Sequence, residues 1–401
     1  MNIKKKVFLV LLVSIFTFFT SLVLFIIGCN SSILINNYFK YIFLGTTILS
    51  FVFLILSILI LIKKRHRQGF KKIIFKVILA LEVLYAVGCI SFVFLLYGPY
   101  NKFREWLITT AMQTMNHKYY CQWFYNDEAI KKVLDNNYIK EVDEDTDESL
   151  IDHKETKEYA SEYEREILEH DPEQTYKVIR FKVNNCNAYL GVVYDPSKVS
   201  VGLTHDLFKY GHYVHRMAKA DGAVLAVNGG AFVNEDRYGA TPLGLTISDG
   251  KIITDGGSIN GVIGITKDNN LVLLKNISGS KALEMGVRDA VTMGPFLIVN
   301  GKSSFISGNG GWGKAARTAI GQRKDGIILL LVVDSNEFRT NGASMLDLTQ
   351  IMERYGAINA ANLDGGTSSC FVEKGELLND PIDSTLAHKS RGLPTYIKVM
   401  E

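Results

Sequence analysis

One short segment late in the chain combines groups that could hold a charged ligand. The segment NLDGGTSSC, residues 362–370, follows an apolar run and holds an acid, two glycines and three hydroxyl side chains. Glycine permits the positive φ of a sharp turn, and consecutive backbone N–H groups after a strand can form an anion-binding nest. The segment is therefore either a plain turn or a cradle for an anion. In a cradle, Asp364 would be a catalytic group or an acceptor for sugar hydroxyls.

A second glycine turn, VNGG at residues 227–230, echoes the first. Residues 206–219 are predicted to form an amphipathic helix before DGAVLAVNGG, and residues 345–355 a helix before YGAINAANLDGG. Ser344 and Asp347 have the spacing of a capping box at the start of the second helix. Each unit consists of a helix, a glycine, a buried strand and a glycine pair. The echo indicates a pseudo-repeat whose two turns face one cleft, or a chance similarity.

Two arginines are candidates for holding a phosphate. Arg317 in KAARTAIGQ lies just before a predicted strand, and its apolar neighbours predict partial burial, so its charge needs a partner. A phosphate can accept two guanidinium N–H groups at once. A structural ion pair with Asp334, at the end of the strand GIILLLVVDS, is the alternative. Arg391 in HKSRGLPTY is a second candidate of the same kind.

The other reactive residue types form no known metal or nucleophile motif. HExxH, GxSxG, Walker and CxxC patterns do not occur. His212 and His215 lie three apart but lack a third ligand, so no cofactor is evident and the use of a divalent cation stays open. Cys121, Cys186 and Cys370 lie outside the apolar spans. We expect three buried thiols, and one disulfide with one free thiol is the alternative.

The first hundred residues read as a membrane region. Residues 7–28, 41–62 and 73–97 are each long enough for a transmembrane helix, which takes about 20 residues. The basic start and the basic loop KKRHRQGFKK predict that both face the cytoplasm. We therefore expect a multi-pass protein of the cell membrane with the lipid bilayer as a partner and its C-terminal part extracytoplasmic. Because the basic residues flank spans, a nucleic-acid partner is not expected.

The remainder divides into a neck and a globular domain. Residues 100–175 predict a helical neck followed by an acidic linker, since residues 141–174 hold fifteen acids and three bases. Residues 176–401 show short alternating strands separated by Gly, Asp and Asn turns. The expected fold class is α+β, with a three-helix transmembrane region at residues 1–99 and a mixed α/β extracytoplasmic domain at residues 176–401.

Several motifs of the globular part, taken in order, resemble the phosphodiester glycosidase family. They are AVNGGAF, TPLGLTISDGK, RTAIGQ, VVDS, GASMLDLTQIMERYGA and NLDGGTSS, within residues 176–398. The resemblance implies hydrolysis of a sugar-1-phosphodiester to the sugar and a phosphomonoester. It implies site residues at Asn228, Gly229, Arg317, Asp364, Gly365 and Gly366. Thr367 stands where the family usually has a third glycine, and Ser335 where it has a glycine after the strand-end acid.

Both lines of argument lead to one expected mechanism. Arg317 and the turn Gly365–Ser368 would hold the phosphate, with Asp364 as acid, base or sugar anchor. Asn228 would place a sugar hydroxyl or water, and Asp334 is the candidate second carboxylate. The expected substrate-binding groups are Gly229, Gly230, Gly365, Gly366, Thr367, Ser368 and Arg391.

The expected partner is a phosphorylated glycan or another sugar-1-phosphodiester. We expect a membrane-anchored hydrolase of cell-surface glycopolymer or exopolysaccharide metabolism. One alternative is a non-catalytic module that binds anionic glycans in a polysaccharide assembly system. Another is a phosphodiesterase that cleaves the P–O bond.

Overall fold

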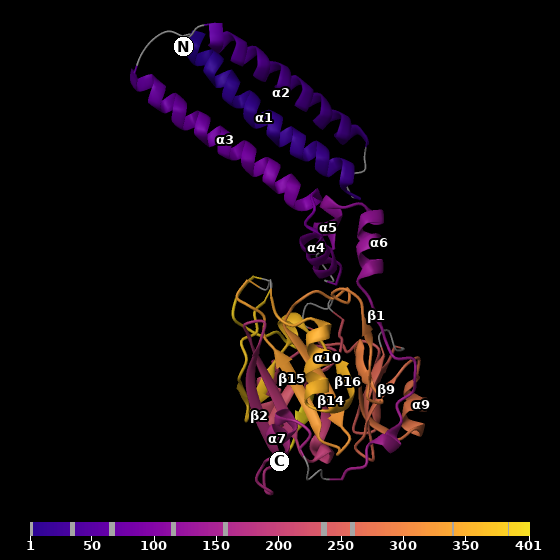
Figure 1. Ribbon diagram of the computed structural model, residues 1–401. Helices are drawn as coiled ribbons and strands as arrows, with labels where there is room; N and C mark the ends of the chain where they lie inside the picture. Colours follow the sequence, from indigo (N-terminus) through magenta and orange to yellow (C-terminus); the bar gives the residue numbers. More distant parts are fainter. Residues whose placement is uncertain are drawn as a thin grey trace. The chain divides into compact units, whose positions relative to one another are not determined.

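The computed structural model divides the chain into two units, residues 1–137 and residues 138–401 (Figure 1). The structure describes residues 3–32, 37–63, 69–113, 118–154, 159–233, 239–256, 261–338, 341–383 and 385–401. The unit boundary at Asn137 precedes the acidic run, whereas the sequence placed the start of the globular domain after it.

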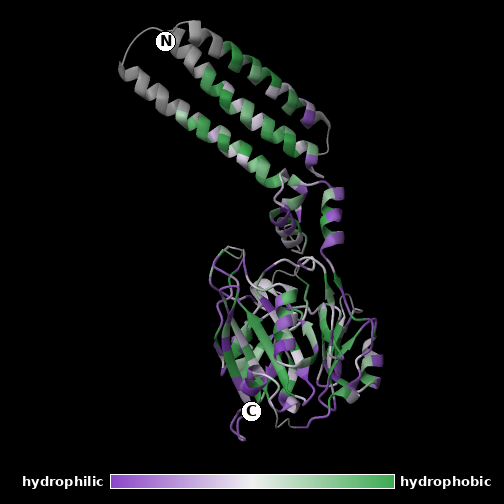
Figure 2. Ribbon diagram, in the orientation of Figure 1, coloured by the Kyte–Doolittle hydropathy of each residue, from purple (hydrophilic) through white to green (hydrophobic). Residues whose placement is uncertain are grey.

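Unit 1 is helical in its described parts. Its helices are α1 (Ile3–Asn30), α2 (Asn37–Lys63), α3 (Gly69–Tyr97), α4 (Asn101–Gln113), α5 (Tyr119–Phe124) and α6 (Asp127–Asn136). Leucine-rich, proline-free runs favour helix in the first three, and Figure 2 shows that their coloured parts are predominantly hydrophobic. The Asn126 side chain caps α6 by accepting a hydrogen bond from the Ala129 N–H at 2.8 Å.

One helix of the described chain is long and apolar enough to cross a membrane by itself, Leu11–Asn30. Val83–Tyr97 and Asn101–Met112 reach that length only together, and Gly98-Pro99 separates them by a bend of 74°. Lys40–Leu56 is a shorter apolar helix. The expected three spans and multi-pass topology are therefore not supported, and one candidate remains. It has the features of a membrane anchor and of a signal sequence alike. The side chain of Glu82, the acid within the predicted span 73–97, lies outside the described residues.

Unit 2 is built from antiparallel sheets. The seven-stranded sheet has the order β12 (Lys302–Ser303), β11 (Phe296–Val299), β16 (Ala357–Asn362), β14 (Arg317–Arg323), β15 (Ile328–Val333), β3 (Cys186–Val193) and β2 (Tyr176–Val183). One five-stranded sheet has the order β7 (Lys251–Asp255), β6 (Leu245–Ser248), β10 (Val287–Thr292), β8 (Val262–Thr266) and β9 (Leu271–Leu274). The other has the order β18 (Glu376–Leu377), β17 (Phe371–Glu373), β5 (Leu225–Asn228), β19 (Thr395–Val399) and β4 (Val199–Leu203). Short strands β1 (Ile139–Lys140) and β13 (Phe305–Ile306) pair separately.

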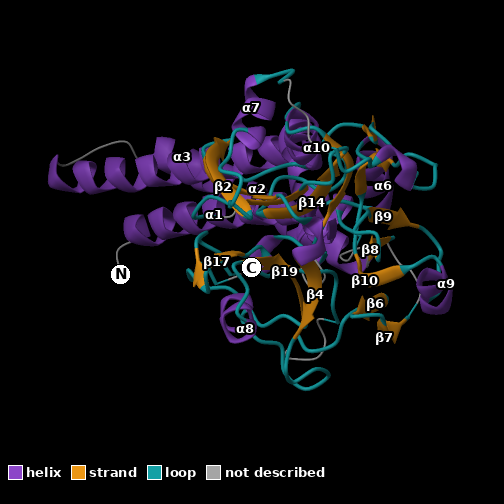
Figure 3. Cartoon of the chain, turned by 90° about the horizontal axis from the view of Figure 1, so that it is seen from below, coloured by secondary structure: helices purple, strands orange, loops and turns teal. Residues whose placement is uncertain are grey.

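The helices of unit 2 lie outside the sheets, as Figure 3 shows for α7, α8, α9 and α10. They are α7 (Glu162–Leu168), α8 (Val214–Asp221), α9 (Gly279–Glu284) and α10 (Met345–Arg354), with single 3-10 turns η1 (Glu148–Leu150), η2 (Pro196–Lys198) and η3 (Gly366–Ser368). This arrangement confirms the expected mixed α/β domain.

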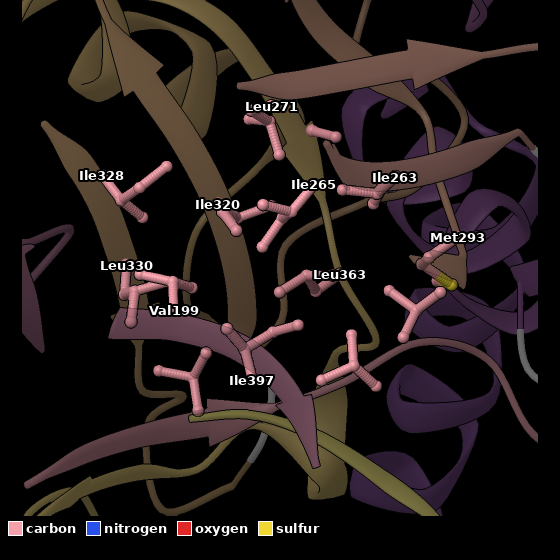
Figure 4. Close-up of a cluster of buried hydrophobic side chains, with 14 of the residues drawn as sticks. Val199, Ile263, Ile265, Leu271, Met293, Ile320, Ile328, Leu330, Leu363 and Ile397 are labelled. Carbon is pink, nitrogen blue, oxygen red and sulfur yellow. The ribbon is translucent and has the colours of Figure 1, made fainter. Parts of the chain in front are cut away.

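The long apolar run of β15 is explained by burial of both faces of the seven-stranded sheet. Ile328 and Leu330 point into a core shared with the two five-stranded sheets, including Ile265 of β8 and Ile397 of β19 (Figure 4). Leu329 and its alternate neighbours on β15 face the opposite cluster, to which α10 contributes. Because strand side chains alternate between faces, a strand covered on both sides is apolar throughout.

The two predicted helices fare differently. The capping box of α10 is present, since the Ser344 hydroxyl accepts from the Asp347 N–H and the Asp347 carboxylate accepts from the Ser344 N–H. The first predicted helix is wrong in its first half, because α8 begins only at Val214. Residues 206–210 form a turn with Phe208 at φ 66°, and His212 pairs with Leu393. His212 and His215 therefore do not share a helix.

Much of the acidic run packs against the sheets of unit 2. The Glu141 carboxylate accepts from the Phe296 N–H at 2.9 Å, and Thr146 exchanges hydrogen bonds with Leu273. Asn270 donates to the Glu148 carboxylate at 2.9 Å. Residues 139–154 are therefore a strap of unit 2, and they do not behave as a solvated linker.

Candidate functional site

Antiparallel pairing of β14 with both neighbours gathers the predicted site residues at one sheet edge. Arg317 opens β14 and is opposite Val333, so Asp334 follows directly beside it. On the other side, the Leu363 N–H donates to the Thr318 carbonyl at 2.8 Å, which brings Asp364 alongside. The start of one strand is thus flanked by the ends of two others.

The two glycine turns meet, as the sequence echo suggested. The Asp364 N–H donates to the Gly229 carbonyl at 3.2 Å, and the Asn228 side-chain amide donates to the Asp364 carbonyl at 2.6 Å. The helices preceding the turns both end at a left-handed glycine, Gly222 at φ 72° and Gly356 at φ 78°. The two echoed segments belong to different sheets, so their contact joins β5 of one sheet to β16 of another.

The Asn228 side chain forms hydrogen bonds with several other groups of the protein. Its side chain is fully buried. Its side-chain oxygen Oδ1 accepts from the Thr318 hydroxyl at 2.7 Å and the Cys370 N–H at 3.1 Å. With its amide bound to Asp364, Asn228 positions the segment that carries the acid. Cys370 is buried in the core, as expected.

Gly229 and Gly230 are required for close packing. A Cβ on Gly229 would lie 2.4 Å from the Thr395 hydroxyl oxygen, and one on Gly230 would lie 2.7 Å from the Thr292 carbonyl oxygen. Their N–H groups donate to the Thr395 carbonyl and hydroxyl at 3.1 and 3.2 Å. Both predicted ligand-binding N–H groups are therefore used within the protein.

The DGG turn combines features of the two structures that the sequence predicted, a plain turn and an anion-binding cradle. Gly366 adopts φ 64°, the left-handed conformation that favours glycine. The Gly365 N–H donates to its neighbour's carboxylate at 2.9 Å, and the Gly366 N–H to the Ala316 carbonyl at 2.8 Å. The Thr367 hydroxyl donates weakly to the Ile382 carbonyl at 3.4 Å. The N–H groups of Gly365 and Gly366 are therefore used in hydrogen bonds within the protein, and other polar groups of the turn are left to a ligand.

Three buried polar atoms in this segment have no hydrogen-bond partner among the described residues: Asn362 Oδ1, Asp364 Oδ2 and Ser369 Oγ. Buried polar atoms are almost always hydrogen-bonded in folded proteins. Three of them within eight residues indicate a place built to meet a polar ligand or water.

The surroundings of the Asp364 carboxyl raise its pKa and so favour its protonated form. Burial raises its pKa, while the Ser368 hydroxyl, the Arg391 charge, the Gly365 N–H and the Arg317 charge act in the opposite direction. Although the residue as a whole is half-buried, its Oδ2 atom is inaccessible to solvent. Desolvation of that oxygen explains why burial dominates.

Arg317 is bound by the protein's own carbonyl groups. It is 6% exposed, donates to the Trp312 and Gly313 carbonyls at 2.6 and 3.2 Å, and lies over the Trp312 ring. Its Nε donates to the Ala343 carbonyl at 3.4 Å. Burial lowers the pKa of Arg317 to about 10. The alternative ion pair with Asp334 does not form among the described groups.

Arg391 is the more accessible cation. It is half-buried, its guanidinium lies 4.6 Å above the Phe232 ring, and its charge acts on Asp364. Phe232 follows the VNGG turn closely, so Arg391 belongs to the same edge of unit 2.

Asp334 is a second buried carboxyl of the site. It is 3% exposed, and burial raises its pKa to about 6, although hydrogen bonds from Asn379 and the Asp380 N–H lower it. The Asn379 amide donates to Asp334 at 2.8 Å and to the Ser369 carbonyl at 3.0 Å. Asn379 thus ties the second carboxyl to the segment that carries the first.

Sequence reasoning missed Asn379, Asp380 and His388. His388 Nδ1 lies 2.7 Å from the Asp380 carboxylate, and the backbone N–H of Asp380 faces Asp334. The pattern NDP at residues 379–381 is typical of a turn, but it does not indicate that the segment lies at the site. Thr395, which accepts hydrogen bonds from both glycines of the VNGG turn, was also missed.

The described residues contain no cluster of three or more His, Cys, Asp and Glu side chains that would bind a metal. A groove of about 600 Å³ runs along β2 and is lined by residues 173–178, 180, 373 and 374. None of the predicted site residues lines it, so the chemistry described above is not located there.

The known proteins that resemble this chain match the part of it that contains the site. Residues 221–400 match the sequence model of the phosphodiester glycosidase family. N-acetylglucosamine-1-phosphodiester alpha-N-acetylglucosaminidase of Bos taurus is 28% identical over 187 residues, covering 42% of this chain and 35% of that protein. The SPbeta prophage-derived uncharacterized protein YomE of Bacillus subtilis (strain 168) is 27% identical over 177 residues, covering 42% and 27%.

The matches span about a third of the length of these curated relatives. Among solved structures, the zebrafish N-acetylglucosamine-1-phosphodiester alpha-N-acetylglucosaminidase catalytic domain, auto-inhibited by its pro-peptide, aligns with a TM-score of 0.49 and 23% identity. It covers 58% of this chain and 85% of that one. The family match and the curated relatives together support a phosphodiester glycosidase domain within residues 221–400 of this chain.

Proposed function

We propose that unit 2 hydrolyses a sugar-1-phosphodiester, releasing the sugar and a phosphomonoester. The observation that carries the proposal is the group of three buried polar atoms without partners at Asn362, Asp364 and Ser369. They lie within the segment matched by the phosphodiester glycosidase family. Asn362 and Ser369 are fully buried, so water would complete their hydrogen bonding, whereas the half-buried Asp364 lies where a polar ligand would meet it.

The raised pKa of Asp364 removes an obstacle to phosphate binding. An ionised carboxylate would repel a phosphodiester, whereas a carboxyl that keeps its proton donates a hydrogen bond to a phosphate oxygen. In our proposal, Asp364 is that donor and Arg391 supplies the positive charge. The Thr367 and Ser368 hydroxyls would exchange their present bonds to the Ile382 carbonyl and the Asp364 carboxyl for bonds to the phosphate, and Arg317 shapes the edge from within.

The second carboxyl, Asp334, would activate the water. Water adds its oxygen to C1 of the sugar, the bond from C1 to the bridging oxygen breaks, and the phosphomonoester keeps that oxygen. Asp334 takes the proton of the attacking water, and Asp364 gives one to the departing phosphate. Asn228 positions the Asp364 segment.

The test is turnover of a panel of sugar-1-phosphodiesters by the full chain, followed by Asp364→Asn. We expect released reducing sugar, and a fall in rate by roughly 10²- to 10⁴-fold in the variant. Asp268→Asn, an exposed acid away from the site, is the control and should retain activity.

Two other results would replace the proposal. Binding of the phosphodiester without turnover would favour the non-catalytic module that binds anionic glycans. If turnover occurs in water labelled with a heavy oxygen isotope and the label enters the phosphate, the P–O bond is cleaved and the protein is a phosphodiesterase.

We further propose that α1 attaches the protein to the cell membrane with unit 2 outside. Lys4, Lys5 and Lys6 precede the apolar stretch and favour a cytoplasmic N-terminus. A single span then places unit 2 on the outer side, where a cell-surface glycopolymer or exopolysaccharide would be its substrate. Protease added to intact cells should degrade unit 2. Protection until the cells are lysed would contradict this placement.

A further inference from the structure

An exposed ion pair reaches the buried Asp334 through one backbone group. The Asp380 N–H faces both carboxylate oxygens of Asp334, at 3.3 and 3.4 Å. The Asp380 carboxylate binds His388 Nδ1 at 2.7 Å. The side chains of His388 and Asp380 are 56% and 57% exposed, whereas Asp334 is 3% exposed. These contacts connect a solvent-accessible imidazole to a carboxyl that solvent does not reach.

The loop that carries the pair is held in place at several points. Ile382 and His388 form a β-bridge, which keeps the two sides of the loop together. The Asp383 carboxylate accepts from the Thr385 and Ala387 N–H groups at 2.7 and 3.0 Å and pairs with Lys389 at 3.0 Å. These contacts of residues 382, 383 and 385–389 hold His388 beside Asp380.

The same loop is tied to the segment that carries Asp364. Asn379 binds both Asp334 and the Ser369 carbonyl, and the Thr367 hydroxyl donates to the Ile382 carbonyl. The loop that carries the ion pair is therefore in direct contact with the segments that carry both carboxyls of the site.

The charges around Asp334 determine what the pair can do. Burial is the largest effect that disfavours the ionised form of Asp334, and the negative charge of Asp380 disfavours it further. The Asn379 amide and the Asp380 N–H favour the ionised form. From the other elements packed against it, the titratable groups that interact with Asp334 are Cys186 and Tyr189 of β3 and Cys370 before β17. Lys314 acts on Cys186, Arg180 on Tyr189 and Asp364 on Cys370.

We propose that the His388–Asp380 pair adjusts how readily the buried Asp334 gives up its proton, through the Asp380 N–H that faces it. The inference rests on the proposed function, in which Asp334 activates water. The negative charge of Asp380 favours the protonated carboxyl. Protonated His388 neutralises that charge, so Asp334 ionises more readily. The pair therefore makes a buried group respond to the pH outside the site.

The test is the pH profile of kcat/KM in the full chain. Asp380→Asn removes the repulsion, so the limb that belongs to Asp334 should move to lower pH by about one unit. His388→Gln keeps a hydrogen-bond donor but removes the positive charge, so the same limb should move to higher pH. In the double variant the His388 substitution should add little, because it acts through Asp380.

His212→Gln is the matched control. His212 pairs with Asp206 at 2.8 Å on another loop and should leave the profile unchanged. NMR titration of the aspartate carboxyl groups, with Asp334→Asn identifying the signal, measures the same shifts without substrate. An inactive protein that shows these NMR shifts would contradict the proposed function alone. Movement of both variants in one direction, or an unchanged Asp334 midpoint in Asp380→Asn, would overturn the coupling.

Discussion

At the scale of single residues, the site depends on two carboxyls that the fold keeps out of water. Asp334 is buried with hydrogen bonds from Asn379 and the Asp380 N–H, and Asp364 is half-buried, with its inaccessible Oδ2 lacking a partner. A carboxyl with a raised pKa stabilises the folded protein at low pH and loses that contribution as the pH rises. Both acids therefore reduce stability at neutral pH, as functional groups commonly do.

Asp334→Asn tests this cost. The pKa of Asp334 is raised from 3.8 to about 6, so the wild-type protein should lose stability as the pH rises between these values. The loss is on the order of 3 kcal/mol, at about 1.4 kcal/mol for each pH unit. Urea unfolding at pH 4 and pH 7 should show that the variant lacks this decline.

Asp221→Asn is a control of opposite sign. Burial raises the pKa of Asp221, but its hydrogen bonds from Lys398 and Tyr396 outweigh burial and lower it. Its contribution is present above the usual pKa and is lost on acidification. The Asp221 variant should therefore be less stable than wild type at pH 7, with the difference fading in acid. The same pH trend in both variants would contradict the assignment.

Arg317→Lys should damage the fold before it affects the chemistry. Lysine cannot reach the Trp312, Gly313 and Ala343 carbonyls together, which leaves buried acceptors without partners. We expect a loss of about 2–4 kcal/mol in the free energy of unfolding. Arg180→Lys on β2, an exposed arginine, should change it by less than about 0.5 kcal/mol. Equal effects would show that Arg317 is not structural.

At the scale of elements, the η3 turn aims the carboxyl. Gly366→Ala places a side chain at φ 64°, which costs roughly 1–2 kcal/mol and should displace Asp364. Turnover should then fall on the order of 10- to 100-fold. Gly301→Ala is the matched control, since Gly301 has φ 74° and open space around its missing Cβ. It should lower the melting temperature without lowering activity. Equal activity in both variants would separate the turn from the site.

Local signals predicted many of the elements well. Alternation predicted β2, and the capping spacing predicted α10, because both depend on residues near in sequence. The start of α8 was misplaced because residues 206–213 share the polarity of a helix while forming a turn. The role of Gly229 was hidden, since its reason lies in Thr395, far along the chain. Sequence patterns locate the turns, but not what faces them across the sheets.

At the scale of the whole molecule, the strap of residues 139–154 defines where unit 2 begins. A fragment starting at Tyr138 keeps the pairing of β1 with β13 and the hydrogen bonds to Phe296 and Leu273. A fragment starting at Thr175 loses them all. We expect the shorter fragment to unfold at a lower urea concentration. Coincident unfolding curves would show that the strap contributes nothing to stability.

The position of β19 has a consequence for how the protein folds. It lies between β4 and β5, both of which precede it by most of unit 2, and Thr395 at its start holds the VNGG turn. Contacts between residues so distant in sequence form slowly, because the intervening chain must first be brought together. Until β19 docks, β4 and β5 are unpaired edges that invite association with other chains. Activity should therefore appear only with the slowest folding phase, and crowded, incompletely folded chains should aggregate through these two strands.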